Sequence, residues 1–183
     1  MIEIIPHGNS GINIFKYKGQ IAMQVVGVEK PFMDLANAVK EDPITTIVEL
    51  GTDYGGLTNL LADHPISDNA EIHTFDVNGS RFKCHNNKIT FYQGTFEQYH
   101  EKITQLITRS GRCLLLCDGG NKPGEFKEYQ KFLKPYDIIM AHDYTCKNWK
   151  WCEFTDNDAN YVGLIPFLQE TFSDYAWCIR TKT

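Results

Sequence analysis

The feature that most limits the fold of this chain is a regular alternation of short apolar runs with helical segments, which begins at Ile44. The β-branched and apolar runs predict strands at Ile44–Leu50, Glu71–Phe75, Ile89–Tyr92, Arg112–Cys117, Asp137–Ala141 and Tyr175–Arg180. The segments between them predict helices at Gly55–Asp63, Phe96–Arg109 with Thr95 as its N-cap, Gly124–Leu133 and Tyr161–Phe172. Such alternation implies βαβ crossovers, and therefore an α/β fold with a mainly parallel sheet and helices on both of its faces.

The first 43 residues follow a different pattern. Ile12–Tyr17 and Gln20–Val26 are strand-like and are separated by Lys18-Gly19, which predicts a hairpin, and Pro31–Val39 predicts a helix. A chain of 183 residues is long enough to bury one substantial core. We therefore expect one domain, residues 1–183, in which 1–43 form an N-terminal hairpin and helix appendage and 44–183 form the α/β core.

Composition and charge exclude several classes of protein. The net charge is −5, which argues against a dominant phosphate-binding surface and predicts no nucleic-acid partner. No apolar run approaches the roughly 20 residues that span a bilayer, and the first residues do not resemble a secretory signal. The six cysteines contain no CxxC pair, and Cys113 and Cys117 are expected to be buried thiols on a strand. Together these features predict a cytoplasmic protein without a membrane partner.

Ligands of such a sheet bind beyond the carboxyl ends of its strands, so the residues after each strand carry most information. The first core strand ends in an E-x-G-x-x-x-G turn made by Glu49, Gly51 and Gly55. An ordinary glycine-rich strand–helix turn would also fit, but neither the dinucleotide G-x-G-x-x-G pattern nor the P-loop pattern is present. Glu49 would repel a diphosphate and would favour a ligand that carries an ammonium and a sulfonium.

The next two strand ends suggest a nucleoside. Asp76 follows the second core strand, where a carboxylate can accept both ribose hydroxyls of an adenosine, although an aspartate here can also form a turn or cap. The third core strand ends in Gln93-Gly94-Thr95, a turn of small residues and an amide beside which an adenine ring could lie.

The fourth and fifth core strands end in acidic residues. Asp118 follows one strand, and His142 and Asp143 follow the other, so these three side chains are expected to converge. They could hold a divalent cation, with Mg²⁺ favoured by the carboxylates and Mn²⁺ or another transition metal left open by the imidazole. Alternatively, His142 is a hydrogen-bonded pocket residue and Asp143 a cap. Trp149 and Trp151 could form the wall of an acceptor pocket or pack within a loop.

With these landmarks in place, the chain resembles a class I S-adenosylmethionine-dependent methyltransferase. The matching residues lie between Ile44 and Tyr144: the glycine turn from Glu49, Asp76, Gly94-Thr95, Asp118 and His142-Asp143. Tyr17-Lys18-Gly19 and Lys30–Asp34 are similar to the cephalosporin hydroxylase-like branch, and the strand-end acids to the catechol-type metal-dependent O-methyltransferases. The resemblance implies a doubly wound, mainly parallel, six- or seven-stranded Rossmann-like methyltransferase sheet, with Trp149–Phe154 as one candidate for the last strand.

The resemblance also implies roles for individual residues. Lys122 or His142 would be the catalytic base, and Asp118, His142 and Asp143 would hold the metal. Glu49 would lie near the methionine part of S-adenosylmethionine, Asp76 would hold the ribose, and Gly94 and Thr95 would border the adenine. The full set implied to bind this cofactor is Glu49, Gly51, Thr52, Tyr54, Gly55, Asp76, Val77, Gly94, Thr95 and Asp118. Two departures from the family pattern are the His142-Asp143 pair, where relatives carry Asp-Asn or two acids, and the position of Lys122, one residue later than usual.

The expected activity is therefore methyl transfer from S-adenosylmethionine to a hydroxyl of a small-molecule acceptor, with a divalent cation lowering the pKa of that hydroxyl. A metal-free enzyme with His142 as base and a non-catalytic S-adenosylmethionine-binding module are the alternatives. A nicotinamide-dependent oxidoreductase and a nucleic-acid methyltransferase fit the glycine spacing and the charge less well. A homo-oligomer is also compatible with the predicted N-terminal hairpin.

Overall fold

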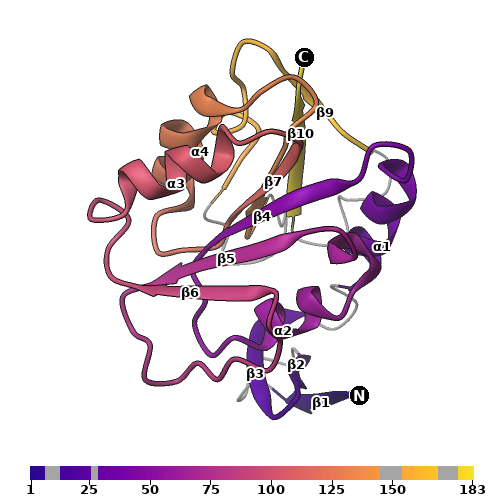
Figure 1. The fold of residues 1–183 in the computed structure, drawn as a ribbon, viewed down its shortest axis with the longest axis vertical. Coiled ribbons are helices and arrows are strands. Elements are labelled where there is room, and N and C mark those ends of the chain that lie inside the picture. The colour runs from indigo at the N-terminus through magenta and orange to yellow at the C-terminus, as the bar shows by residue number, and fades with distance from the viewer. Residues whose placement is uncertain (7–12, 26–28, 145–153, 169–176) are drawn as a thin grey trace.

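The computed structural model describes residues 1–6, 13–25, 29–144, 154–168 and 177–183. In this part of the chain seven strands form one sheet in the order β6-β5-β4-β7-β8-β10-β9 (Figure 1). The strands are β4 (Ile44–Leu50), β5 (Glu71–Asp76), β6 (Ile89–Gln93), β7 (Arg112–Cys117), β8 (Ile138–His142), β9 (Leu164–Pro166) and β10 (Trp177–Lys182). The first five are parallel, and β10 runs antiparallel to both β8 and β9. The predicted doubly wound, mainly parallel sheet is confirmed, with seven strands. The order reverses between β4 and β7, where such folds bind ligands.

The seventh strand corrects the sequence prediction. Leu164–Pro166 is a short strand inside the segment predicted as a helix, Tyr161–Phe172, and residues 161–168 contain no helix. Gly163 has a φ of +78°, which stops helical propagation, and Ile165 pairs with Thr181 of β10. Sheet pairing therefore decides the local structure here. Of the alternative candidate, Trp149–Phe154, only Phe154 lies within the described residues.

Helices cover both faces of the large sheet (Figure 1). The helices α1 (Glu29–Ala38) and α2 (Gly56–Ala62) pack on one face, where Phe32, Leu61 and Ile47 belong to one buried core. The helices α3 (His100–Ile107) and α4 (Lys122–Tyr129) pack on the other face, where a second core contains Ile103 and Phe126. Single helical turns of 3₁₀ type occur at Pro65–Ser67 and Gln130–Phe132.

Two smaller predictions can be checked in the same region. Contrary to the prediction, Thr95 is not the N-cap of the helix: its Oγ1 accepts the N–H of Gln98 within a turn, residues 96–99 form turns, and the α-helix begins at His100 after Tyr99. Cys113 and Cys117 are free thiols buried in β7, as expected.

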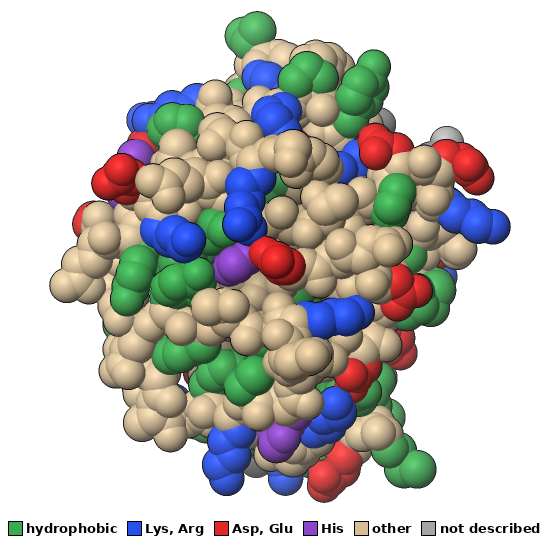
Figure 2. Space-filling view, viewed as in Figure 1, with side chains coloured by type: hydrophobic (Ala, Val, Ile, Leu, Met, Phe, Trp, Pro, Cys, Tyr) green, Lys and Arg blue, Asp and Glu red, His purple; other side chains and the backbone are tan. Residues whose placement is uncertain are grey.

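The face of the molecule drawn in Figure 2 has no single dominant charge. Figure 2 shows acidic, basic and apolar side chains interspersed over one face of the molecule. Within the described residues, no helix is both long enough and apolar enough to cross a membrane.

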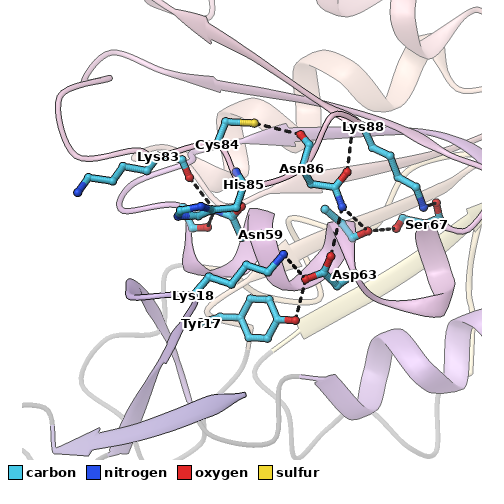
Figure 3. Close-up of polar contacts among 12 residues, drawn as sticks. Tyr17, Lys18, Asn59, Asp63, Ser67, Lys83, Cys84, His85, Asn86 and Lys88 are labelled. Atoms are coloured by element: carbon cyan, nitrogen blue, oxygen red, sulfur yellow. Dashed lines mark hydrogen bonds and ion pairs between the residues drawn. The ribbon is translucent and has the colours of Figure 1, made fainter.

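The N-terminal segment forms a second, three-stranded antiparallel sheet with strands β1 (Ile2–Pro6), β2 (Asn13–Tyr17) and β3 (Gln20–Val25). The predicted hairpin is therefore present, and β1 adds a strand that the sequence pattern did not predict. The turn of the hairpin is fixed to the end of α2, where Asp63 Oδ2 accepts a hydrogen bond from Tyr17 (2.8 Å) and pairs with the Lys18 ammonium (2.6 Å), as Figure 3 shows.

The same small sheet is also held against the loop that follows β5. Gln20 Oε1 accepts the N–H of Lys83 (2.8 Å), and Asn59 of α2 bonds to the backbone of Lys83 and His85 in that loop (Figure 3). Gly56 allows β3 to approach α2 closely, since a Cβ there would lie 2.5 Å from the Ile21 carbonyl. These contacts position β3 across the carboxyl edge of the large sheet.

Candidate functional site

A cavity of about 220 Å³ lies at the carboxyl ends of the central strands. Five groups of described residues line it: residues of β3, the turn after β4, the start of α2, the ends of β7 and β8, and the first residue of α4. The lining residues are Ile21, Ala22, Met23, Gln24, Gly51, Thr52, Asp53, Gly56, Leu57, Asp118, Lys122, His142 and Asp143. The reversal in strand order between β4 and β7 creates this opening.

The glycine turn after β4 has the backbone geometry that its sequence predicted. Gly51 has a φ of +100°, and a Cβ at this position would collide with the Asp118 carbonyl. Its N–H donates to the Phe75 carbonyl at 2.9 Å, so the turn is held between the ends of β5 and β7. Gly55, with a φ of +78°, stands just before α2. Both glycines adopt the left-handed region that the turn requires, and Gly51 also lets the turn pack closely against the end of β7.

Glu49 is a buried carboxyl group at the end of β4, 1% exposed. Its Oε2 accepts hydrogen bonds from Thr58 (2.6 Å) and Thr74 (2.5 Å), whereas its Oε1 has no partner among the described residues. Burial raises the pKa of Glu49 to about 7, against the two threonine hydrogen bonds, which lower it. A cationic or hydrogen-bond-donating ligand would satisfy Oε1 and favour the ionised form.

Asp76 and Gly94 lie at adjacent strand ends beside this turn. The two Asp76 oxygens accept the N–H groups of Asp53 and Asn78, each at 2.8 Å, and the Gly94 N–H donates to the Asp76 carbonyl. Val77 is 65% exposed. These residues form a continuous edge with the glycine turn, although they are outside the lining of the cavity.

The remaining residues predicted to bind the cofactor lie on the same edge. The Tyr54 ring faces the Arg81 guanidinium, 4.7 Å from the ring centre. The side chain and N–H of Thr95 are occupied by Gln98, so the hydroxyl serves the turn before α3.

The predicted convergence of Asp118, His142 and Asp143 is present in the cavity wall. Nδ1 of His142 lies 3.2 Å from Oδ1 of Asp118 and 3.3 Å from Oδ1 of Asp143. Because carboxylate oxygens only accept hydrogen bonds, Nδ1 carries the hydrogen. Lys122 Nζ lies 3.0 Å from Oδ2 of Asp143 and donates to the Gly119 carbonyl at the same distance. The cluster therefore contains both of the predicted catalytic residues.

The environment of His142 makes it a plausible proton acceptor. Its Nε2 is buried and has no hydrogen-bond partner among the described residues, and its ring packs on Trp177 with centroids 4.8 Å apart. Burial lowers the pKa of His142, but the charges of Asp118 and Asp143 outweigh burial and raise that pKa overall. With Nδ1–H held by the carboxylates, the neutral imidazole keeps its lone pair on Nε2.

A divalent cation does not fit the cluster as it is arranged. Within the described residues, no group of three or more His, Cys, Asp or Glu side chains could hold a metal ion. The ammonium of Lys122 and the Nδ1–H of His142 already occupy the carboxylate oxygens that the sequence assigned to a metal. The expected Mg²⁺ site therefore needs a rearrangement of this cluster.

One residue of this site, Gln24 of β3, was not predicted from the sequence. It is 5% exposed, and its Nε2 donates to Oδ2 of Asp118 at 2.5 Å, while its Oε1 has no partner among the described residues. The two residues are 94 positions apart, so no local pattern could connect them. Thr74 was also missed, although the parallel register places it opposite Glu49. Of the predicted acceptor wall, Trp149 and Trp151 lie outside the described residues.

Comparison with solved structures places this geometry in a known fold. A caffeoyl-CoA O-methyltransferase candidate from Staphylococcus aureus is 12% identical, with a TM-score of 0.60 over 84% of this chain and 83% of that one. CmcI with Mg and SAM is 14% identical, with a TM-score of 0.65 over 92% and 76%. The chain has the fold of the class I methyltransferases. CmcI with SAH gives a TM-score of 0.62 at 14% identity, over 92% of this chain and 82% of that one.

Sequence comparisons add no closer relative. No family model matches the chain, and no curated protein matches it. The similarity to class I methyltransferases is therefore a similarity of fold, and the reaction must be argued from the residues of the site.

Proposed function

We propose that this chain is an S-adenosylmethionine-dependent methyltransferase that methylates a hydroxyl group of a small molecule. The observation that carries the proposal is that one cavity is lined both by the glycine turn after β4 and by the Lys122–His142–Asp118–Asp143 cluster. Methyl transfer requires a donor and an acceptor in contact, and this cavity brings a nucleoside-binding turn next to a base.

The cofactor side of the proposal depends on Glu49 and Asp76. S-adenosylmethionine supplies a methyl group on a sulfonium and also carries an ammonium, a ribose and an adenine. Glu49 Oε1 is buried and unpaired among the described residues, and it would accept a hydrogen bond from the ammonium group of S-adenosylmethionine. Asp76 lies two strand ends away from Asp118. It would accept hydrogen bonds from the ribose hydroxyls in place of those that it accepts from the N–H groups of Asp53 and Asn78.

The acceptor side depends on His142. A hydroxyl group bound in the cavity would donate its hydrogen to Nε2, and its oxygen would attack the methyl carbon with the electron pair freed by that transfer. The carbon–sulfur bond breaks, the pair goes to sulfur, and the products are a methyl ether and a neutral thioether. Asp118 and Asp143 would hold the imidazole in the required tautomer and stabilise the imidazolium that forms.

Metal assistance, which the sequence favoured, is the weaker of the two routes. Each carboxylate of the cluster already has a hydrogen-bond donor or cation of this chain beside it. We therefore propose the metal-free route, with His142 as base and Lys122 as the nearby positive charge.

A small acceptor fits the site better than a nucleic acid does. The cavity is about 220 Å³ and is bounded on one side by β3, and the net charge of the chain is −5. The face drawn in Figure 2 carries acidic and basic side chains side by side rather than a continuous basic surface. Binding of nucleic-acid phosphates would need such a surface.

Calorimetry with S-adenosylmethionine, S-adenosylhomocysteine, NAD and ATP tests the cofactor. We expect the first two to bind and the last two not to bind, and a preference for NAD or ATP would contradict the proposal. A panel of hydroxylated small molecules, assayed for S-adenosylhomocysteine release with and without EDTA, tests the reaction. Turnover that survives EDTA supports the metal-free route, and cofactor binding without turnover on any acceptor would indicate a binding module instead.

A further inference from the structure

We propose that the ammonium of Lys122 is a built-in cation that takes the place of a divalent metal at this cluster. Wild-type protein would then bind no divalent cation there, and loss of the lysine charge would create a divalent-cation site. The catalytic meaning of this inference rests on the proposed function. The binding test below does not, because it measures a metal and needs neither cofactor nor acceptor.

The first argument is the position of Lys122, which is 6% exposed. Buried lysines are rare unless their charge is paired, and here Nζ lies 3.0 Å from Asp143 Oδ2. The residue is the first of α4, and Asn121 caps this helix by accepting the N–H of Gly124. Glu125 accepts the N–H groups of Gly119 and Asn121, which ties the preceding loop to the helix. The backbone that carries Lys122 is therefore held in place, and it positions the ammonium at the cluster.

The second argument is that each of the four carboxylate oxygens of the cluster lies within 3.3 Å of a nitrogen of this chain. Asp118 Oδ2 accepts from Gln24, Asp143 Oδ2 pairs with Lys122, and both Oδ1 atoms face Nδ1 of His142. For Nδ1 to coordinate a metal, it would have to lose the hydrogen that holds both carboxylates. A metal would thus replace several satisfied contacts rather than fill an empty position.

The third argument is charge. Asp118 and Asp143 together carry two negative charges, and Lys122 compensates one of them at 3.0 Å. A divalent cation added to the same cluster would lie close to the ammonium in a buried environment, where repulsion between like charges is strong. Removal of the lysine charge leaves the two carboxylates, of which Asp143 is 29% exposed, and the buried imidazole, a donor set that suits Mg²⁺ or Mn²⁺.

In the proposed reaction, Lys122 would then act as a positive charge toward the acceptor oxygen rather than as the base. Its ammonium lines the same cavity as His142. A hydroxyl that loses its hydrogen to His142 would develop negative charge, and a fixed ammonium nearby would stabilise it.

The test is titration of Mn²⁺ followed by electron paramagnetic resonance, in which the signal of free aqueous Mn²⁺ falls as the ion binds. The variants are wild type, Lys122→Gln, Lys122→Arg and the double variant Lys122→Gln with Asp143→Asn. Lys127→Gln is the matched control, since Lys127 is an exposed lysine of the same helix. Circular dichroism verifies that each variant is folded, and Lys122→Ala replaces Lys122→Gln if the glutamine variant is not.

We expect the charge-neutral Lys122 variant to bind Mn²⁺ at least about tenfold more tightly than wild type, and the double variant to lose this gain. Lys122→Arg and Lys127→Gln should match wild type. Two results would overturn the inference: tight Mn²⁺ binding by wild type that Asp143→Asn abolishes, or no gain of binding in either neutral Lys122 variant. If the variants bind Mn²⁺ as expected but calorimetry detects no S-adenosylmethionine binding to wild type, the inference stands and the proposed function fails.

Discussion

The two halves of the proposed site are built differently. The cofactor half, around Glu49, Gly51 and Asp76, comes from one continuous βαβ segment, β4 to β5. The acceptor half joins Gln24 of the small sheet to Asp118 and His142 at the ends of β7 and β8. One half is local in sequence, whereas the other depends on packing between distant segments.

The two halves also differ in how their carboxylates are satisfied. Asp118 and Asp143 have a donor of this chain at every oxygen, while Glu49 has one oxygen without a partner among the described residues. The carboxylates of the acceptor half thus face groups of this chain, whereas the cofactor half leaves one carboxyl oxygen open to a positively charged or donating ligand. Four substitutions would break or sharpen this contrast.

The largest effect is expected in the acceptor half. His142→Gln should lower the rate of methyl transfer by about 10²- to 10⁴-fold, because the proton acceptor is removed, while S-adenosylmethionine affinity stays close to wild type. Single-turnover kinetics with an acceptor from the panel, alongside calorimetry, would measure both. His100→Gln, which changes a surface partner of Glu128, is the control. If the His142→Gln variant retains full activity, His142 is not the base.

The second effect concerns stability in the cofactor half. The pKa of Glu49 in the folded protein is about 7, above its ordinary value of 4.5, so its contribution to stability is present below about pH 4.5 and is lost as the pH rises through about 7. Glu49→Gln should abolish this dependence. The difference in unfolding free energy between variant and wild type should grow by about 3 kcal/mol in favour of the variant across this range.

Denaturant titration of the ligand-free proteins at both ends of the range would measure that difference. Glu101→Gln, an exposed carboxyl on α3, is the control. Saturating S-adenosylmethionine should flatten the wild-type curve, since the ammonium would stabilise the ionised carboxylate. Identical pH dependence in variant and wild type would show that Glu49 ionises as an ordinary carboxyl.

A third substitution tests the ribose contact. Asp76→Ala should weaken S-adenosylmethionine binding about 10- to 100-fold, the range expected for hydrogen bonds to a charged group. Part of this loss would come from the loop, because Asp76 also accepts the N–H groups of Asp53 and Asn78. Calorimetry compares the variant with Asp68→Ala, which changes an exposed residue distant from the turn in sequence. If Asp76→Ala binds S-adenosylmethionine as tightly as wild type does, Asp76 does not contact the ribose.

The smallest effect is expected at Gln24. Gln24→Ala removes a neutral donor from Asp118 and an unpaired amide oxygen from the cavity wall, so the KM for the acceptor should rise by about 2- to 10-fold. The affinity for S-adenosylmethionine should not change, and this split between the two ligands is the informative result. Lys16→Gln is the control, since Lys16 lies on β2, the central strand of the small sheet, and pairs with Glu3 rather than with the cavity. Equal losses for both ligands would mean that β3 only supports the fold.

Local patterns were sufficient for most of the architecture. The runs at Ile44–Leu50 and Arg112–Cys117 became β4 and β7 with the predicted bounds, because buried parallel strands are continuous apolar segments. The pattern failed at Tyr161–Phe172, where apolar spacing suited a helix. Gly163 and pairing with β10 made Leu164–Pro166 an edge strand instead.

The sequence by itself determined the succession of strands and helices from β4 to β8 and the glycine turn after the first core strand, since both depend on residues close together in the chain. It therefore also predicted at which edge of the sheet a ligand is expected to bind. Only the tertiary structure decided that Gln24 reaches Asp118, that Lys122 pairs with Asp143, and that Glu49 keeps an oxygen free of partners in the described part of the chain. Those outcomes depend on distances between segments far apart in sequence, and they decide whether a carboxylate meets a side chain of this protein or requires a ligand.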